Sequence, residues 1–409
     1  MDNGQCREVT ADYQLSIDHS PLDEVPPGYK RTKVGVIPED WDARTLRDDI
    51  KLLSGHHVLA QYCNTDGVGA PYLTGPADFP DGQINVTRFT TAPTTICERG
   101  DILVTVKGSG AGTLIVSDGR YCISRQLMAI RADQWNKTFL FYSLMQNATE
   151  FQAAATGLIP GLSRADILLQ VIPVPRSADE QRAIATALSD VDALITALDK
   201  LIAKKRAIKT AAMQQLLTGK ARLPGFSGEW ETKRLGEVCD IRKGELITAS
   251  TAKPGIIPVI GGGTSVSYCH DTPNRAANTI TISASGANAG YVAFHDYPIF
   301  ASDCSTIEEG EVYDIKFIYY LLSNYQKTLT SLQTGGAQPH VYPEQLAPLS
   351  FAFPEQPEQT AIAQVLSDMD AEIATLEARR DKTRAIKQGM MQQVLTGRVR
   401  LVKPEMEAC

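Results

Sequence analysis

The sequence predicts an α+β protein made of two copies of one unit, in which a globular segment of mixed α and β structure precedes a long helix. Segments 180–223 and 358–401 align at a constant shift of 178 residues without a gap, and 25 of the 44 aligned residues are identical. Both segments carry apolar residues at helical spacing, and the stretches before them share a weaker order of strands and turns. We therefore expect a pseudo-two-fold internal repeat whose two helices pair as an antiparallel coiled coil.

The order of these patterns divides the chain into alternating globular and helical parts. The predicted parts are an N-terminal extension (1–33), a first globular segment (34–176), a first helical segment (177–222), a second globular segment (223–354), a second helical segment (355–403) and a C-terminal tail (404–409).

Composition and charge limit the class of protein. The chain has 409 residues, of which 43% are hydrophobic and 21% charged, as expected for a globular protein of two or three domains. No apolar run of roughly 18 residues is present, so we expect a cytoplasmic protein without membrane contact. The net charge of −7 argues against a chain that binds nucleic acid tightly by itself, because phosphate neutralisation by Lys and Arg supplies most non-specific affinity.

The two helices are predicted from apolar residues that alternate spacings of four and three, which is typical of a coiled-coil seam. We expect Asp179 to cap the first helix, and Gly219 and Gly397 to end the first and second helices. The seam residues are Ile184, Leu188, Val191, Ile195, Leu198 and Ile202 in the first helix, and Ile362, Leu366, Met369, Ile373 and Leu376 in the second.

Charge is distributed unevenly along each helix. Acidic residues concentrate between Asp179 and Asp199 and basic residues between Lys200 and Arg222, and the second helix repeats this order. One explanation is that the charges complement the helix macrodipole. The other is that antiparallel pairing places the acidic half of each helix beside the basic half of the other. Both remain open from the sequence.

The globular segments repeat more weakly than the helices. Each opens on a Trp followed five residues later by Leu, as Trp41 with Leu46 and Trp230 with Leu235. The remaining shared features are a strand, glycine turn and strand at 100–116 and 278–294, a helix around 139–145 and 317–322, a Thr-Gly loop at 156–157 and 334–335, and a proline-bounded strand at 170–176 and 349–355. The helical segments match better in sequence than the globular segments. We therefore expect the two copies to share one structural framework but to contact different partners.

Several catalytic motifs are missing from the sequence. There is no Gly-x-x-x-x-Gly-Lys-Ser/Thr loop for a nucleotide and no Asn/Asp-Pro-Pro-Tyr/Phe run for a base-amino methyltransferase. The glycine-rich stretch 107–112 lies between predicted strands, which indicates a hairpin turn. The eight cysteines form no Cys-x-x-Cys pair, and His56, His57 and His270 have no partner at metal-ligand spacing. We therefore expect no enzyme activity and no metal site.

The sequence resembles the specificity subunits of type I restriction and modification enzymes. The resemblance is carried by "VGVIPEDWDARTL" (34–46), the strand-turn-strand stretches, the Thr-Gly loops and the helices that run from "EQ-x-x-IA" to "MQQ-x-LTG". It implies that each globular segment is a target-recognition domain for one half of a split double-stranded DNA sequence. It further implies that the paired helices set the gap between the halves and dock two methyltransferase subunits.

The resemblance also implies how the full complex divides its chemistry. Two motor-nuclease subunits would join to give the restriction form. S-adenosylmethionine, ATP and Mg²⁺ would belong to these partners, and this chain would bind none of them. The alternative from another class is a non-catalytic coiled-coil scaffold whose two modules bind protein or glycan.

Candidate DNA-contacting residues lie after the strand-turn-strand stretches and around the Thr-Gly loops, where the resemblance places contacts. They are Lys107, Ser109, Ser163 and Arg164 in the first module, and Ser285, Asn288, Gln338 and His340 in the second. Structural roles compete with this interpretation. Ser163 and Asp166 have the spacing of a capping box, and Gln338 has the chemistry to brace its own loop.

Overall fold

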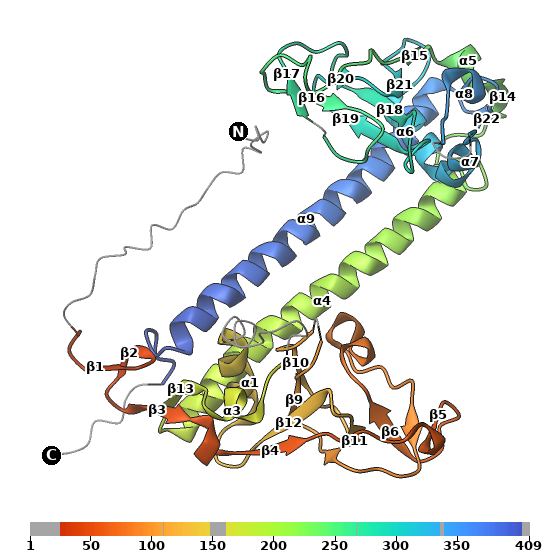
Figure 1. Cartoon of the computed structure of the whole chain (residues 1–409). Coiled ribbons are helices and arrows are strands. Elements are labelled where there is room, and N and C mark those ends of the chain that lie inside the picture. The colour runs from red at the N-terminus through yellow and green to blue at the C-terminus, as the bar shows by residue number, and fades with distance from the viewer. Residues whose placement is uncertain (1–24, 109, 148–160, 267, 336–338, 403–409) are drawn as a thin grey trace. The chain divides into compact units, whose positions relative to one another are not determined.

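Figure 1 presents a computed structural model, which describes residues 25–108, 110–147, 161–266, 268–335 and 339–402. These residues pack into two compact units. The N-terminal unit contains described residues of 25–198 together with 379–402, and the C-terminal unit contains those of 199–378. The division falls inside both long helices, so each unit combines one globular module with a segment of each helix.

The centre of the N-terminal unit is a four-stranded sheet in the order β10-β9-β12-β4, with antiparallel neighbours throughout. All four residues of β9 are buried, because Ile102 and Val104 face one hydrophobic core while Leu103 faces another. The strands are β4 (Ile50–Ser54), β9 (Ile102–Thr105), β10 (Leu114–Val116) and β12 (Leu127–Ala132).

A second sheet of this unit has the order β5-β7-β6-β11-β8, in which β6 and β11 are parallel. Its strands are β5 (Cys63–Asn64), β6 (Ala70–Leu73), β7 (Phe89–Thr90), β8 (Ile96–Cys97) and β11 (Tyr121–Ile123). Two further pairs are β1 (Tyr29–Thr32) with β2 (Gly35–Pro38), and β3 (Trp41–Thr45) with β13 (Val171–Pro175). The helices are η1 (Leu46–Asp48), η2 (Ala60–Tyr62), η3 (Pro76–Asp78), η4 (Pro80–Gly82), α1 (Lys137–Gln146) and α3 (Arg164–Leu168).

The C-terminal unit repeats this topology. Its four-stranded sheet has the order β15-β21-β18-β19, β16 pairs in parallel with β20 and antiparallel with β17, and β14 pairs with β22. The strands are β14 (Glu231–Arg234), β15 (Ile241–Lys243), β16 (Ile257–Ile260), β17 (Tyr268–His270), β18 (Thr279–Ser283), β19 (Val292–His295), β20 (Phe300–Ala301), β21 (Cys304–Ile307) and β22 (Ser350–Phe353). The helices are α5 (Leu235–Val238), α6 (Ile315–Asn324), α7 (Gln326–Ser331) and α8 (Pro343–Leu346).

The elements predicted inside the globular segments are confirmed. The two strand-turn-strand stretches form the antiparallel pairs β9–β10 and β18–β19, and the helices expected near 139–145 and 317–322 are α1 and α6. The proline-bounded strands are β13 and β22. The first Thr-Gly loop, at 156–157, lies outside the described residues.

The long helices are α4 (Ala178–Leu216) and α9 (Gln356–Val394), with 39 residues each. The prediction that Asp179 caps α4 is wrong, because the helix begins one residue earlier. The Ser177 hydroxyl accepts a hydrogen bond from the Glu180 backbone N–H at 3.4 Å, and the Asp179 carboxylate instead pairs with Arg182. Gly219 and Gly397 follow the helices with φ of +67° and +72°, the left-handed conformation expected after a helix end.

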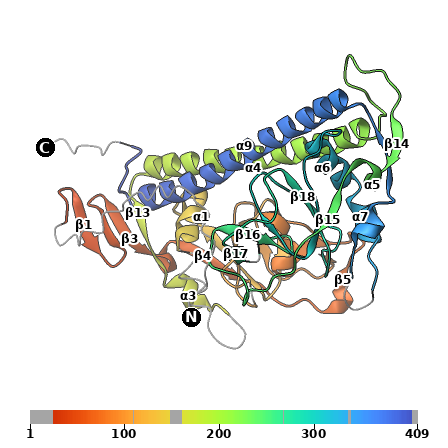
Figure 2. The same cartoon turned by 90° about the horizontal axis from the view of Figure 1, so that it is seen from above.

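In each unit a segment of α4 lies beside a segment of α9, as Figures 1 and 2 show. In the C-terminal unit, Lys205 pairs with Glu372, Lys209 with Asp370 and Arg222 with Glu358. In the N-terminal unit, Lys387 pairs with Asp192 and Arg400 with Glu180. Within each unit, residue numbers rise along one segment as they fall along the other, and acidic early residues meet basic late ones.

Most of the predicted seam residues are buried. Ile184 and Leu188 share the core of the N-terminal unit with Met391 and Val394 of α9 and with Leu395, which follows α9. The buried seam residues are Ile184, Leu188, Leu198, Ile202, Ile362, Leu366 and Ile373, and the half-buried ones are Val191, Ile195, Met369 and Leu376.

Candidate nucleic-acid interface

The β9–β10 turn and the loop before α3 meet in the N-terminal unit. Lys107 forms an isolated antiparallel bridge with Gly161, and the Leu162 N–H donates to the Val106 carbonyl at 2.9 Å. Leu162 and Val106 are buried, whereas Lys107 is exposed. Apolar packing below the turn therefore presents the Lys107 ammonium group to solvent.

The same two segments meet at the equivalent place in the C-terminal unit. Ser285 forms an isolated bridge with His340, and the Val341 N–H donates to the Ala284 carbonyl at 3.0 Å. Val106 and Ala284 are related by the shift of 178. The fold thus brings together Ser285 and His340, two residues that the sequence singled out separately.

Aromatic and basic side chains continue this cluster in the C-terminal unit. The His340 and Tyr342 rings are stacked with centroids 5.5 Å apart and an interplanar angle of 7°. The Lys243 ammonium lies 6.0 Å from the Tyr342 ring centroid, at the limit of a cation–π contact. Asn288 is exposed in the β18–β19 turn, where its backbone carbonyl accepts from Tyr291 at 2.9 Å.

Ser163 and Arg164 have structural contacts. The Ser163 hydroxyl accepts from the Asp166 N–H at 3.2 Å and the Asp166 carboxylate accepts from the Ser163 N–H at 2.7 Å, so the capping box is confirmed. The Arg164 guanidinium donates to the Ser54 hydroxyl at 2.7 Å and to the Leu52 carbonyl at 3.2 Å. Ser163 therefore caps α3, and Arg164 holds α3 against β4. Ser109 and Gln338 lie outside the described residues.

A third segment joins each cluster, and sequence reasoning missed it. Gln126 precedes β12, and its carbonyl accepts from the Val106 N–H at 2.8 Å. Asp303 precedes β21, and its carbonyl accepts from the Ala284 N–H at 3.1 Å. The one signal in the sequence was a serine followed by polar residues where each strand begins, in "SRQL" (124–127) and "SDCS" (302–305). This motif is too short to be recognised as a repeat without the strand pairing.

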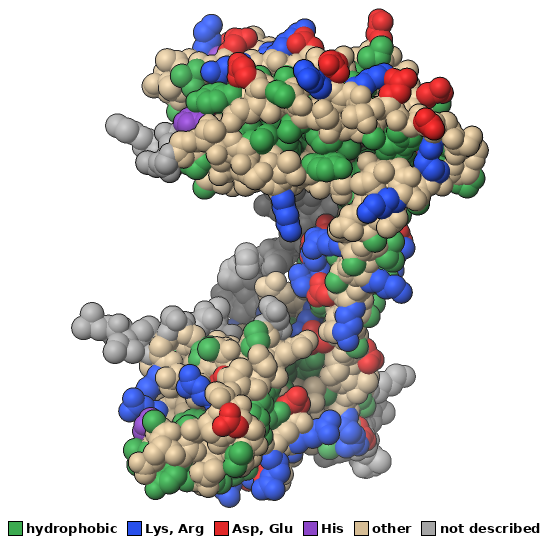
Figure 3. Space-filling view, turned by 90° about the vertical axis from the view of Figure 1, so that its right-hand side faces the viewer, with side chains coloured by type: hydrophobic (Ala, Val, Ile, Leu, Met, Phe, Trp, Pro, Cys, Tyr) green, Lys and Arg blue, Asp and Glu red, His purple; other side chains and the backbone are tan. Residues whose placement is uncertain are grey.

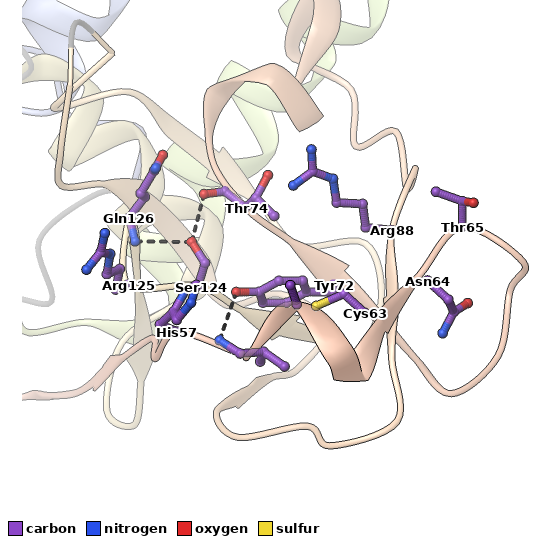
Figure 4. Close-up of a pocket in the computed structure, with 12 residues that line it drawn as sticks. His57, Cys63, Asn64, Thr65, Tyr72, Thr74, Arg88, Ser124, Arg125 and Gln126 are labelled. Atoms are coloured by element: carbon purple, nitrogen blue, oxygen red, sulfur yellow. Dashed lines mark hydrogen bonds between the residues drawn. The ribbon is translucent and has the colours of Figure 1, made fainter.

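Gln126 also lines a cavity of about 410 Å³ in the N-terminal unit. Figure 4 shows Gln126 and Arg88 on either side of Thr74. The Ser124 hydroxyl donates to the Thr74 carbonyl at 2.7 Å and accepts from the Gln126 N–H at 3.1 Å, which fixes the backbone beneath Gln126. Arg88 and Arg125 add two cationic side chains to the lining of the cavity, which suits contact with phosphate.

Charge elsewhere on the units is mixed. Figure 3 shows basic and acidic side chains interspersed over the globular parts, with Lys and Arg frequent on the helical part. The three-segment clusters differ in their charged side chains: the N-terminal cluster contains Lys107 and Arg125, whereas the C-terminal cluster contains Asp303 together with the nearby Lys243. The same backbone pairing therefore presents different hydrogen-bonding side chains in the two units.

In each unit a buried glutamate at the start of one long helix binds both a tryptophan of the module and an arginine that follows the other long helix. In the N-terminal unit, Glu180 accepts from the Trp41 indole at 3.1 Å and from Arg400 at 2.8 Å. In the C-terminal unit, Glu358 accepts from Trp230 at 3.2 Å and from Arg222 at 2.6 Å. Glu180 and Glu358, like Arg222 and Arg400, are related by the shift of 178.

A second repeated contact joins a tyrosine, an aspartate and a lysine. Asp192 accepts from the Tyr142 hydroxyl at 2.7 Å and from Lys387 at 2.8 Å, and Asp370 accepts from Tyr320 at 2.8 Å and from Lys209 at 2.7 Å. Burial, together with the hydrogen bond to Asp192, raises the pKa of the Tyr142 phenol. Burial raises the pKa of the Tyr320 phenol as well, so both phenols are neutral hydrogen-bond donors at physiological pH.

No group of three or more His, Cys, Asp or Glu side chains in the described part of the chain is placed to hold a metal ion. None of the described helices is both long and apolar enough to cross a membrane.

The repeated topology and the paired polar clusters define a two-module recognition protein. The chain belongs to the family defined by the type I restriction modification DNA specificity domain, whose sequence model matches residues 38–209 and 227–384. It is a type I restriction-modification specificity subunit with two such domains, as the resemblance implied.

Relatives and solved structures agree with this assignment. The chain is 27% identical over 406 residues to the type I restriction enzyme MjaVIII specificity subunit of Methanocaldococcus jannaschii, covering 89% of this chain and 94% of that protein. It is 29% identical over 200 residues to the putative MjaX specificity subunit of the same organism, covering 48% of this chain and 47% of that protein. The crystal structure of an S subunit from M. genitalium has the same fold, with a TM-score of 0.63 and 19% identity over 87% of this chain and 96% of that chain.

Proposed function

We propose that this chain reads a bipartite double-stranded DNA target, with one unit on each half-site, and that it carries out no chemistry itself. The observation that carries the proposal is the repeated cluster of turn, loop and pre-strand segment. It has the same backbone pairing in both units, through Val106 and Ala284, but different side chains. Recognition of two different half-sites requires different hydrogen-bonding side chains, and here they are placed on the same backbone arrangement.

The helices, in this proposal, form an antiparallel coiled coil that fixes the gap between half-sites and docks two methyltransferase subunits. The α4–α9 ion pairs, which run in opposite directions within each unit, and the buried apolar stripe support this pairing. An inverted repeat matches the two-fold symmetry of the duplex backbone, so both modules can dock alike. Two motor-nuclease subunits would complete the restriction form. S-adenosylmethionine, ATP and Mg²⁺ would be bound by the partners.

The isolated chain is expected to bind its target weakly. Its net charge is −7, and a protein gains most non-specific affinity by neutralising phosphates. At physiological salt we expect a Kd of roughly 10⁻⁶ M or weaker for the chain alone, and tightening by about 10³-fold when the methyltransferase supplies basic surface. Fluorescence anisotropy with a labelled duplex would measure both. Tight binding by the chain alone would contradict the shared-surface model.

Exchanging one module tests the two-module assignment. Replacing residues 230–353 with those of a relative should change one half-site and leave the other unchanged. Methylome sequencing of a host that carries the hybrid with its methyltransferase would show both halves at once. A change in the recognised sequence of both half-sites would rule out the assignment of one module to each half-site. Failure to recover any methyltransferase complex would instead favour a scaffold for protein or glycan partners.

A further inference from the structure

Gln126 and Asp303 occupy the same place in the two units, although the shift of 178 does not align them. Leu127 pairs with Thr105 in the β12–β9 register, and Cys304 pairs with Ser283 in the β21–β18 register. Thr105 and Ser283 are related by the repeat, so the residues just before Leu127 and Cys304 correspond. The N-terminal unit has one additional residue here, Arg125, which hides the correspondence in the sequence.

A glycine lies under each of these side chains. Gly75 comes two residues after β6 and Gly262 two residues after β16, so the glycines also occupy equivalent places. A Cβ atom on Gly75 would lie 2.5 Å from the Gln126 amide oxygen. One on Gly262 would lie 2.8 Å from the Ser285 carbonyl and 3.1 Å from an Asp303 carboxylate oxygen. Each unit therefore leaves room for the side chain that precedes the strand to lie over this glycine.

The two side chains are accessible and differ in chemistry. Gln126 is exposed, and among the described residues its amide group makes no hydrogen bond. Asp303 is half-buried and accepts a hydrogen bond from the Ser285 hydroxyl. A glutamine amide both donates and accepts, which matches adenine N6 and N7 in the major groove. A carboxylate only accepts, which matches the cytosine N4 amino group.

We infer that Gln126 and Asp303 are the equivalent base-reading residues of the two units, with Gln126 selecting adenine in one half-site and Asp303 selecting cytosine in the other. The inference deepens the proposed function and rests on it. Lys107 and Ser285, which sit beside them on the turns, then contact neighbouring phosphates or bases.

The test uses the full chain in complex with its methyltransferase and a library of randomised DNA duplexes. Sequencing the methylated products gives the base preference at every position of both half-sites. The informative variants are Gln126→Glu, which removes the donor, and Asp303→Asn, which adds one. Asp296→Asn is the matched control, because Asp296 is exposed in the same unit at the other end of the β18–β19 pair.

Asp303→Asn is expected to lower the preference for cytosine over adenine at one position of one half-site by roughly ten- to hundredfold. Gln126→Glu should lower adenine preference in the other half-site by a similar factor. Asp296→Asn should change neither half. If the complex that carries Asp303→Asn methylates no DNA, the Asp303→Glu complex provides the test instead. Because this variant keeps the carboxylate, it must methylate DNA with the cytosine preference of the wild-type complex.

Different results would overturn the proposed function and the base-reading roles of Gln126 and Asp303. A wild-type complex that selects no two-part sequence would overturn the proposed function. A wild-type complex that selects a bipartite site, combined with Gln126 and Asp303 variants that leave its base preferences unchanged or alter both halves, would overturn the inference alone. The same holds if Asp303→Glu fails to restore cytosine preference.

Discussion

Replacing Glu180 with alanine is expected to lower the free energy of unfolding of the N-terminal unit by about 3–5 kcal/mol. The Glu180 side chain is 1% exposed and the Arg400 side chain 18%. Removing the carboxylate leaves the Arg400 guanidinium mostly buried with Asp40 as its one anionic partner among the described residues, and leaves the buried Trp41 indole N–H without its acceptor. Hydrogen exchange resolved by segment would measure the loss, because it reports opening of each unit separately.

Two variants make this result interpretable. Glu39→Ala removes an exposed carboxylate from the same unit and should change unfolding free energy by less than about 0.5 kcal/mol. Glu358→Ala removes the equivalent carboxylate beside Arg222 and should open the C-terminal unit first. Equal destabilisation of both units by Glu180→Ala would contradict the division of the helices between them.

Replacing Leu366 with alanine is expected to destabilise the C-terminal unit by about 2–5 kcal/mol. Leu366 is 0% exposed and packs in the core that also holds Leu216 from the other helix. Truncation removes buried apolar area and leaves a cavity where the two helix segments and the module meet. Denaturant titration combined with segment-resolved hydrogen exchange would give the loss.

The matched control for Leu366→Ala is Leu246→Ala. Leu246 belongs to the same unit but is 84% exposed, so the same truncation should alter stability by less than about 0.5 kcal/mol. If the two substitutions have similar effects, the Leu366 position contributes no packing to the helix seam.

Local patterns in the sequence predicted most of the regular structure. The α4 and α9 helices follow from apolar spacing, and the β9–β10 and β18–β19 pairs follow from alternating strands around glycine turns. The cap of α4 was predicted two residues after the one observed, since Ser177 and Asp179 both have side chains that can accept from the helix N-terminus. Such boundaries depend on a single hydrogen bond.

The candidate site was only partly predictable, because it depends on contacts distant in sequence. Ser285 and His340 were both predicted from the resemblance, but their bridge emerges only from tertiary pairing. Arg164 had the chemistry of a base contact, yet its guanidinium is directed to Leu52 and Ser54, more than a hundred residues earlier. Gln126 was missed because one extra residue before β12 breaks the repeat's register.

The grouping of residues 379–402 with residues 25–198 also sets an order of events on the ribosome. Residues 199–378, which include the described part of the C-terminal unit, are synthesised as one continuous stretch, so every residue of its core has been made before Arg379 is added. The N-terminal module emerges earlier, but it lacks Met391, Val394 and Arg400 until they are synthesised. The part of the chain made first is therefore the last to gain its full set of packing partners.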